Sequence, residues 1–260
     1  MNYSTLLYDV RDRIGFITLN RPEKLNALTQ TSWKEIRQAL KVGERDPGVA
    51  IHLITGNDRA FCAGDDISVL TQVKNLSDAE DLFLHCIYGL VDTMIHLQKP
   101  VISAVNGLAY GGGCEIVLLS DIAVASEKAT FALPEGRIGA FPAIFSVFGP
   151  VALGIKVSNE LTLLGEPISA HRAFDIGLVN RVAPQQEFMA EAVRMAQQLM
   201  KSSQMSLKIT RETSSKILGE RLHDFWIACQ RFAKEVSRTE DFLEGATAFV
   251  EKRSPRFVGH

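Results

Sequence analysis

The sequence predicts an α/β fold that ends in a mostly helical region. Short apolar runs typical of buried strands alternate with helical segments over about the first 120 residues. From residue 188 onward the apolar residues recur with helical spacing instead. A chain of 260 residues is long enough for one sizeable core, or for a core with a smaller appendage.

The first predicted unit is a strand followed by a helix. Residues 14–19 (IGFITL) are all apolar except for one glycine and one threonine, as expected of a buried strand. Arg21-Pro22 then breaks the pattern, because proline cannot continue a ladder of backbone hydrogen bonds. A helix is expected to start near Thr29 and to run to about Val42.

Two further units repeat this alternation. Residues 49–55 (VAIHLIT) predict a second strand, which a polar turn at 56–59 ends. A helical segment from about 77 to 97 leads to a third strand at 101–105 (VISAV). Glycines then precede a helical run at 114–120, so the pattern of strand and helix continues.

The last 70 or so residues are predicted to be mostly helical, with little sequence that favours strands. They also carry more large apolar side chains than a short solvated tail needs: Phe225, Trp226, Ile227, Phe232, Phe242 and Phe249. Packing within the chain and packing on another subunit are both compatible with this pattern. We therefore divide the chain into a core region, 1–187, and a helical C-terminal region, 188–260.

Composition excludes several classes of protein. The chain has 28 Lys and Arg against 30 Asp and Glu, a net charge of -2, so no global charge attracts nucleic acid or an acidic membrane. The longest apolar stretches are far shorter than the roughly 20 residues that span a bilayer. No partner of either kind is expected.

Cysteine and histidine spacing gives no sign of a metal site. The four cysteines form no C-x-x-C pair, and the six histidines form no cluster with the spacing of metal ligands. No secretory leader is recognisable at the start of the sequence. We expect a reduced protein in the cytoplasm, with no metal.

Two acidic residues are the strongest indication of catalysis. Glu115 follows the run Gly111-Gly112-Gly113-Cys114, and Glu135 follows Pro134. Glycines before a helix can leave backbone N–H groups free to stabilise negative charge, and nearby carboxylates can move protons. Alone, Glu115 would be an acid in the first turn of a helix, Glu135 an acid in a solvated loop, and the glycines a tight turn.

Four stretches in order identify a family. They are RPEKLNAL at 21–28, AFCAGDDI at 60–67, NGLAYGGGCE at 106–115 and ALPEGRIG at 132–139. With this order and spacing the chain resembles the crotonase, or enoyl-CoA hydratase/isomerase, superfamily, and AFVEKR at 248–253 is similar to the family's C-terminal segment. The resemblance implies a crotonase-like spiral of β-β-α repeats, with a helical C-terminal region that assembles trimers, often paired into hexamers.

The resemblance also implies an oxyanion site made of two backbone N–H groups. In the family these donors hold the thioester oxygen of an acyl-CoA, and by motif position they belong to Asp65 and Gly112. Losing one such donor typically costs ~2.7–4 kcal/mol of transition-state stabilisation. The backbone of Asp65, not its side chain, would do this work.

Glu115 and Glu135 occupy both acid/base positions of the family's hydratases. The implied reaction is the reversible addition of water to a 2-enoyl-CoA, which gives a 3-hydroxyacyl-CoA without metal or redox cofactor; CoA is part of the substrate. An enoyl-CoA isomerase, which can work with one carboxylate, and a thioester-enolate decarboxylase are alternatives of the same fold. A catalytically silent binding or scaffold protein is the alternative of another class.

The chain departs from the family pattern at two places. Asp65 is acidic where many relatives have a small residue, so its carboxylate must turn away from the enolate, be neutralised, or contact the acyl group. After Gly139 a glycine-rich run is replaced by 140–145 (AFPAIF). The N–H of Ala143 is still available to a catalytic water, whereas Phe141 and Phe145 either line an acyl pocket with Leu70 or fill the core.

Contacts to CoA are assigned by the resemblance alone. The family positions for the pantetheine, phosphate and adenine correspond here to six residues near the first two motifs: Lys24, Leu25, Ala27, Ala63, Asp66 and Ile67. For Asp66 a role in stabilising the turn is favoured over catalysis. Phe249 and Lys252 match positions that reach the CoA of a neighbouring subunit. Either lysine would also be unremarkable on a solvated surface.

Overall fold

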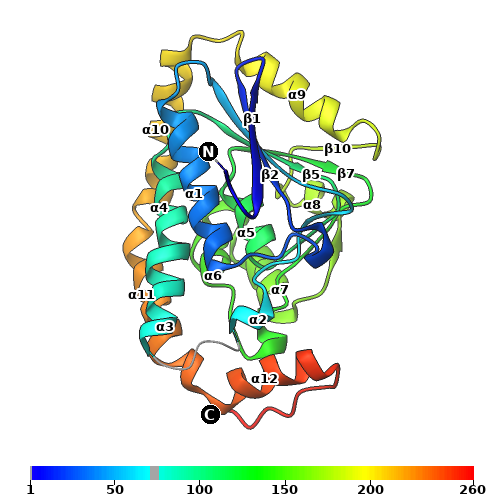
Figure 1. The fold of residues 1–260 in the computed structure, drawn as a ribbon, viewed down its shortest axis with the longest axis vertical. Helices are drawn as coiled ribbons and strands as arrows, with labels where there is room; N and C mark the ends of the chain where they lie inside the picture. Colours follow the sequence, from blue (N-terminus) through cyan, green and yellow to red (C-terminus); the bar gives the residue numbers. More distant parts are fainter. Residues whose placement is uncertain (1, 71–75) are drawn as a thin grey trace.

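The chain forms two β-sheets surrounded by helices (Figure 1). The computed structural model describes residues 2–70 and 76–260, with only the backbone described for Val69 and Leu70. The larger sheet has the order β1-β2-β3-β5-β7-β10, with strands Leu6–Arg11, Ile14–Leu19, Ile51–Gly56, Val101–Val105, Ile122–Ser126 and Arg181–Ala183. All its neighbouring strands are parallel except β1 and β2.

The smaller sheet explains the spiral. Its order is β4-β6-β8-β9, with strands Ala60–Cys62, Leu108–Tyr110, Thr130–Ala132 and Ile168–Ser169. The chain therefore leaves one strand in each sheet on every turn, as β3 then β4, β5 then β6, and β7 then β8. Asn106 joins two of these turns, because its side-chain amide donates to the carbonyl oxygen of Ala60 at 3.0 Å. The predicted spiral of β-β-α repeats is confirmed.

The predicted helix near Thr29 is α1, Gln30–Arg45. Thr29 caps it, since its hydroxyl accepts from the N–H of Ser32 and the Ser32 hydroxyl accepts from the N–H of Thr29. The segment predicted as one helix over 77–97 has three parts: α3 (Leu76–Glu80), the π-helical η2 (Asp81–Ile87) and α4 (Tyr88–His96). Periodicity near 3.6 does not reveal such a widened turn.

Short helices follow β2 of the larger sheet and β4, β6 and β8 of the smaller sheet, and they carry the predicted site residues. They are η1 (Pro22–Lys24), α2 (Ile67–Leu70), α5 (Gly112–Leu119) and η3 (Glu135–Ile138). After η3 come α6 (Ala143–Leu153), α7 (Ile155–Leu164) and α8 (Ala170–Asp175).

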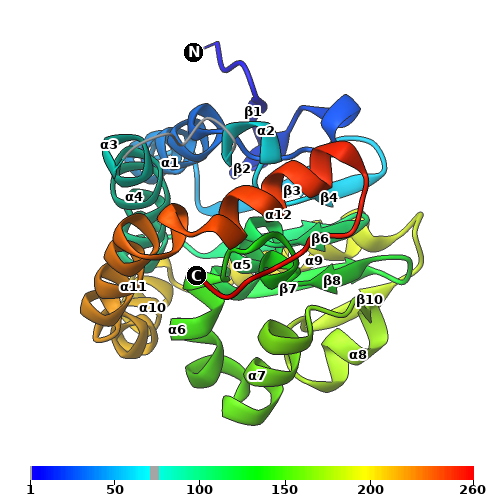
Figure 2. The same cartoon turned by 90° about the horizontal axis from the view of Figure 1, so that it is seen from below.

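The C-terminal region is helical, as predicted. Its elements are α9 (Phe188–Leu199), α10 (Gln204–Gly219), α11 (Leu222–Lys234), η4 (Val236–Arg238) and α12 (Glu240–Glu251). Helix α9 covers β5 and β7 on one face of the larger sheet, while α10 and α11 pack beside α4 (Figures 1 and 2). From residue 188 to the end of the chain, which is wholly within the described part, no strand is present.

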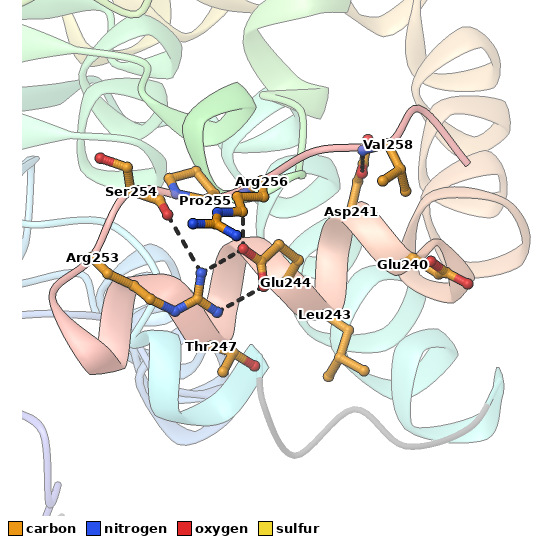
Figure 3. Close-up of a pocket in the computed structure, with 10 residues that line it drawn as sticks. All are labelled: Glu240, Asp241, Leu243, Glu244, Thr247, Arg253, Ser254, Pro255, Arg256 and Val258. Carbon is orange, nitrogen blue, oxygen red and sulfur yellow. Dashed lines mark hydrogen bonds and ion pairs between the residues drawn. The ribbon is translucent and has the colours of Figure 1, made fainter.

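Helix α12 packs against η3 and α2, the two segments on either side of the predicted site (Figure 2). The tail folds back along this helix: Arg253 pairs with Glu244, and the N–H groups of Val258 and Gly259 donate to Asp241 (Figure 3). A cavity of about 1080 Å³ lies between α12 and the tail. This cavity is separate from Glu115 and Glu135, which do not line it.

Substitution of Gly245 by alanine is expected to destabilise the protein. A Cβ atom at Gly245 would lie 2.3 Å from the carbonyl carbon of Ile138, so α12 must move off η3. Overpacking of this kind typically costs about 1–3 kcal/mol. Urea unfolding measures the change in free energy.

The matched control is Gly219→Ala, at the end of α10. Its Cβ would have only Ile95 Cγ2 nearby, at 3.9 Å, so the better helix propensity of alanine should leave stability equal or higher. Equal midpoints for Gly245→Ala and Gly219→Ala would contradict the close packing of α12.

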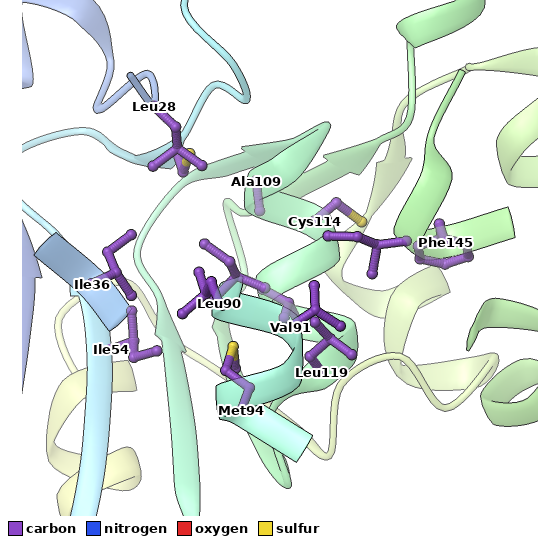
Figure 4. Packing of buried hydrophobic residues seen from close by; sticks show 14 of the residues in the cluster. Leu28, Ile36, Ile54, Leu90, Val91, Met94, Ala109, Cys114, Leu119 and Phe145 are labelled. Atoms are coloured by element: carbon purple, nitrogen blue, oxygen red, sulfur yellow. The ribbon is translucent and has the colours of Figure 1, made fainter. Parts of the chain in front are cut away.

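The main core lies between the two sheets and the helices. Figure 4 shows Leu90 and Met94 of α4 gathered with Ile36 of α1 and Ile54 of β3. A second cluster lies on the opposite face of the larger sheet, under α9. The C-terminal aromatic residues are divided: Phe225, Phe232 and Phe242 are buried within the chain, whereas Phe249 is 59% exposed. Packing within the chain therefore accounts for part of this apolar surface.

Within the described residues, no helix is both long enough and apolar enough to cross a membrane.

Candidate active site

Three parallel strands of the smaller sheet bring the predicted site residues to one edge. In the order β4-β6-β8, each strand is hydrogen-bonded to the next, and parallel strands end at the same edge of a sheet. Asp65 follows β4, Gly112 and Glu115 follow β6, and Glu135 follows β8. Residues far apart in the sequence therefore meet because of the sheet order.

Glu115 lies in the first turn of α5 and is 6% exposed. Its Oε1 accepts a hydrogen bond of 2.9 Å from the N–H of Phe145. Phe145 is in the first turn of α6, where backbone N–H groups have no acceptor within the helix. The N-terminus of α6 therefore holds the Glu115 carboxylate in place.

Glu135 is the first residue of η3, and its carboxyl lies against Gly111. Its Oε1 would be 3.0 Å from a Cβ atom at Gly111, so a side chain there would displace the carboxyl. Its Oε2 is buried and, in the described part of the chain, has no hydrogen-bond partner. A buried carboxyl oxygen without a partner lowers the stability of the folded protein, and it is typical of a group that binds a ligand or a water.

The two glutamates favour their protonated forms. Burial raises the pKa of Glu115 to about 8, although the N–H of Phe145 opposes the shift; the charge of Asp65 adds to it. Burial also raises the pKa of Glu135 well above its ordinary value, and the charge of Glu115 raises it further. Two carboxyl groups with raised pKa values at one place are suited to acid/base chemistry near neutral pH.

Among the described residues, no hydrogen bond is recorded from the N–H groups of the two predicted oxyanion donors. Gly112 is the first residue of α5, so its N–H has no acceptor within that helix. Asp65 forms an isolated parallel bridge with Leu28, in which Leu28 donates to Gly64 and Asp66 donates to Leu28, each at 2.8 Å. The N–H of Asp65 is not used by this bridge and is directed away from Leu28.

The side chain of Asp65 is held by a residue that the sequence analysis missed. Trp33 Nε1 donates to Asp65 Oδ1 at 2.7 Å. Burial raises the pKa of Asp65 to about 6, and the Trp33 hydrogen bond opposes that shift. The sequence left open whether this carboxylate turns away from the enolate, is neutralised or contacts the acyl group. The structure shows that one of its oxygens is hydrogen-bonded to Trp33 of α1.

The family can be decided by comparison with known proteins. A family model described as enoyl-CoA hydratase/isomerase matches residues 9–260. The chain belongs to the enoyl-CoA hydratase/isomerase family. Its α/β fold is that of the crotonase superfamily.

Relatives and solved structures agree. A probable mitochondrial enoyl-CoA hydratase of Dictyostelium discoideum is 35% identical over 97% of this chain and 90% of its own length. A mitochondrial enoyl-CoA hydratase of Pongo abelii is also 35% identical, over 98% of this chain and 88% of its own. A carnitinyl-CoA hydratase from Mycobacterium avium is similar in structure, with a TM-score of 0.87 and 33% identity over 98% of this chain and 99% of its own.

The predicted CoA-binding residues of this enoyl-CoA hydratase/isomerase family member fall into two groups. Leu25 and Ala63 are neighbours, because the N–H of Ala63 donates to the oxygen of Leu25 at 3.0 Å. Ala27 lies beside them, and its oxygen accepts from Arg21 Nη1 at 2.6 Å. Lys24 is exposed at the end of η1.

Asp66 has the structural contacts expected of a turn residue. Its Oδ1 accepts from the N–H of Ser68 at 3.1 Å, and its Oδ2 pairs with Arg21 at 2.9 Å. Ile67 is the half-buried first residue of α2. Phe249 and Lys252 lie on the surface at the end of α12, and their role at a neighbouring subunit stays a prediction.

The predicted acyl-pocket residues differ in their surroundings. Phe141 is half-buried and stacks on Phe232 of α11, with ring centroids 5.4 Å apart. Phe145 is 0% exposed and is part of the core, while its N–H holds Glu115. The side chain of Leu70 lies outside the described residues. Ala143 is the first residue of α6, so its N–H has no acceptor within the helix.

The raised pKa of Glu115 predicts how stability depends on pH. A carboxyl with a higher pKa in the folded than in the unfolded chain binds more protons when folded, so the free energy of unfolding falls as pH rises between the two values. For Glu115 this window runs from its ordinary 4.5 to about 8. Glu115→Gln should therefore stabilise the protein at pH 8 and not at pH 4.5.

Denaturant unfolding of the Glu115→Gln variant and the parent protein at both pH values measures this difference. Equal changes in the free energy of unfolding at pH 4.5 and pH 8 would contradict a raised pKa for Glu115.

Proposed function

We propose that this protein is an enoyl-CoA hydratase that adds water reversibly to a 2-enoyl-CoA and gives a 3-hydroxyacyl-CoA. The observation that carries the proposal is that the buried carboxyl groups of Glu115 and Glu135 feel each other's charge and lie at the sheet edge that also carries Asp65 and Gly112. Full-length relatives named enoyl-CoA hydratase support it. The substrate class is an acyl-CoA thioester.

The two glutamates have different hydrogen-bond partners, and this difference indicates which one accepts a proton and which one donates it. Phe145 donates to Glu115 and favours its ionised form, whereas Glu135 Oε2 has no partner among the described residues. In the state with one shared proton, Glu135 carries the proton and Glu115 is ionised. Glu115 then accepts a proton from water as the oxygen attacks the β carbon, and Glu135 supplies a proton to the α carbon.

The N–H groups of Asp65 and Gly112 stabilise the negative charge that forms on the thioester oxygen. Attack at the β carbon moves an electron pair onto the thioester oxygen, and the enolate collapses when the α carbon is protonated. Backbone donors stabilise that charge without reorganising, which makes them effective in a water-poor site. The N–H of Ala143 can orient the attacking water. No further cofactor takes part in the proposed reaction, because CoA arrives with the substrate.

Self-association into a homotrimer or homohexamer is also proposed. Four large apolar side chains on the adjacent α7 and α8 are 47 to 79% exposed: Ile155, Leu163, Leu164 and Phe174. An apolar surface of this kind is typical of an interface. Light scattering would measure the assembly.

The cytoplasm is the proposed compartment. All four cysteines are free thiols, as expected in a reducing compartment, although two relatives are named mitochondrial.

Incubation with a panel of 2-enoyl-CoA esters tests the proposal. Hydration removes the conjugated thioester absorbance, and the product is identified as the 3-hydroxyacyl ester by mass. The panel should include short and medium unbranched esters and one with a quaternary ammonium group, because one structural neighbour is named carnitinyl-CoA hydratase. Bound esters without hydration anywhere in the panel would refute the proposal.

The same panel separates the alternatives. Conversion of a 3-enoyl-CoA into its conjugated 2-enoyl isomer would indicate an isomerase. Release of carbon dioxide from a malonyl-type thioester would indicate a decarboxylase. Binding of a non-thioester partner without any turnover would indicate a scaffold.

A further inference from the structure

We propose that Trp33 is a positioning residue of the oxyanion site. Its indole N–H holds the Asp65 carboxylate and its ring supports Gly112, so that the acidic side chain stays out of the space where the thioester oxygen becomes negative. The inference rests on the proposed function, and it concerns a residue, Trp33, that lies outside the motifs that identify the family.

The first contact is the hydrogen bond to Asp65. Trp33 is in the first turn of α1 and is 1% exposed, so its N–H needs an acceptor within the protein. Asp65 Oδ1 is that acceptor, at 2.7 Å. No other hydrogen bond to this carboxylate is recorded among residues 2–70 and 76–260.

The second contact is with Gly112. Carbons Cζ2 and Cη2 of Trp33 lie 2.8 and 3.1 Å from the place of a Cβ atom at Gly112. The outer edge of the indole ring therefore lies directly against the glycine that provides the second donor. One side chain thus contacts both oxyanion residues: its N–H contacts Asp65, and the neighbouring edge of its six-membered ring contacts Gly112.

The charges around Asp65 show why its carboxylate must be held. Among the described residues, the carboxyl groups that act on it or feel its charge are those of Asp66, Glu115 and Glu135, and the Cys62 thiol feels its charge as well. Arg21, the nearby cation, is paired with Asp66 instead. A carboxylate released from Trp33 would add negative charge beside a forming enolate, which opposes the reaction.

Trp33→Phe, made with and without Asp65→Ala, tests this inference. Phenylalanine removes the N–H, and the cavity it leaves is the same in both backgrounds. With Asp65 present, kcat should fall by about tenfold or more, up to the ~10²–10³-fold effect of losing one oxyanion donor. In the Asp65→Ala background, Trp33→Phe should lower kcat by a clearly smaller factor, because only the ring contact with Gly112 is then lost. Equal losses in both backgrounds would mean that Trp33 only fills the core and would overturn the inference.

A measurement without turnover separates this inference from the proposed function. A conjugated 2,4-dienoyl-CoA absorbs at longer wavelength when donors polarise its carbonyl. Trp33→Phe should reduce this shift more when Asp65 is present than in the Asp65→Ala background. Such a result supports the inference even if no enoyl-CoA is hydrated.

A second pair of variants leaves the core intact if Trp33→Phe does not fold. Asp65→Asn keeps an oxygen acceptor for Trp33 without the charge, so the dienoyl shift should be retained. Asp65→Glu is one methylene longer and cannot keep its carboxylate at the present place, so the shift should be lost. The same shift in both variants would overturn the inference.

Discussion

Glu135→Gln is expected to lower kcat for hydration by about 10²–10⁴-fold, the usual contribution of a general acid or base. Glutamine keeps the shape of the side chain beside Gly111, but it cannot give a proton to the α carbon. Because the oxyanion donors are unchanged, KM for the thioester should change much less than kcat. Steady-state kinetics with a 2-enoyl-CoA measure both constants.

Variants of other acidic residues test whether the fall in kcat is due to the loss of the catalytic carboxyl group. Glu115→Gln should lower kcat over the same range of about 10²–10⁴-fold, and the double variant should mainly bind the thioester. Glu127→Gln is the matched control, because Glu127 is an exposed acid between β7 and β8. Near-normal turnover in either site variant would reduce that glutamate to a structural acid.

Gly112→Ala is expected to lower kcat by about 10²–10³-fold, the effect of losing one oxyanion donor. Its Cβ atom would lie 2.8 Å from Trp33 Cζ2 and 3.2 Å from Leu28 Cδ1. Neither is free to move, since both side chains are 1% exposed, so the backbone of α5 must shift and take its N–H away from the thioester oxygen.

The helical variant Gly219→Ala controls for the added methyl group, because its surroundings are open. The dienoyl-CoA absorbance provides a second readout, and Gly112→Ala should reduce its shift. A Gly112→Ala enzyme with normal kcat and an unchanged absorbance shift would show that this N–H does not hold the thioester.

The elements predicted best are those whose local pattern agrees with their final environment. The strands at 14–19 and 101–105 have the predicted bounds, because they are apolar on both faces and lie inside the larger sheet. The strands of the smaller sheet have only two or three residues, too few for periodicity to show. The π-helical turns of η2 were missed for another reason: there Phe83 stacks on Phe232, with ring centroids 3.9 Å apart, and that contact is tertiary.

For the site, the sequence supplied the chemical groups and the structure supplied their partners. Glu115 and Glu135 were predicted as a pair, and the structure adds that Phe145 donates to one of them only. The replacement of the glycine-rich run after Gly139 suggested bulk at Phe145, yet the backbone of that residue is what contacts the site. Trp33 could have been suspected, since a tryptophan on a predicted helix needs an acceptor and Asp65 is an unusual acid.

The sequence by itself determined the family, the order of the motifs and the residue types that we propose for the acid/base and oxyanion chemistry. Only the tertiary structure decided which groups touch, because the order β4-β6-β8 brings segments about 20 to 70 residues apart to one sheet edge. Burial at that edge raises the pKa of both glutamates, and it leaves Asp65 with Trp33 as its hydrogen-bond donor. Such effects depend on distance and on exclusion of water, and a linear pattern of residues contains neither.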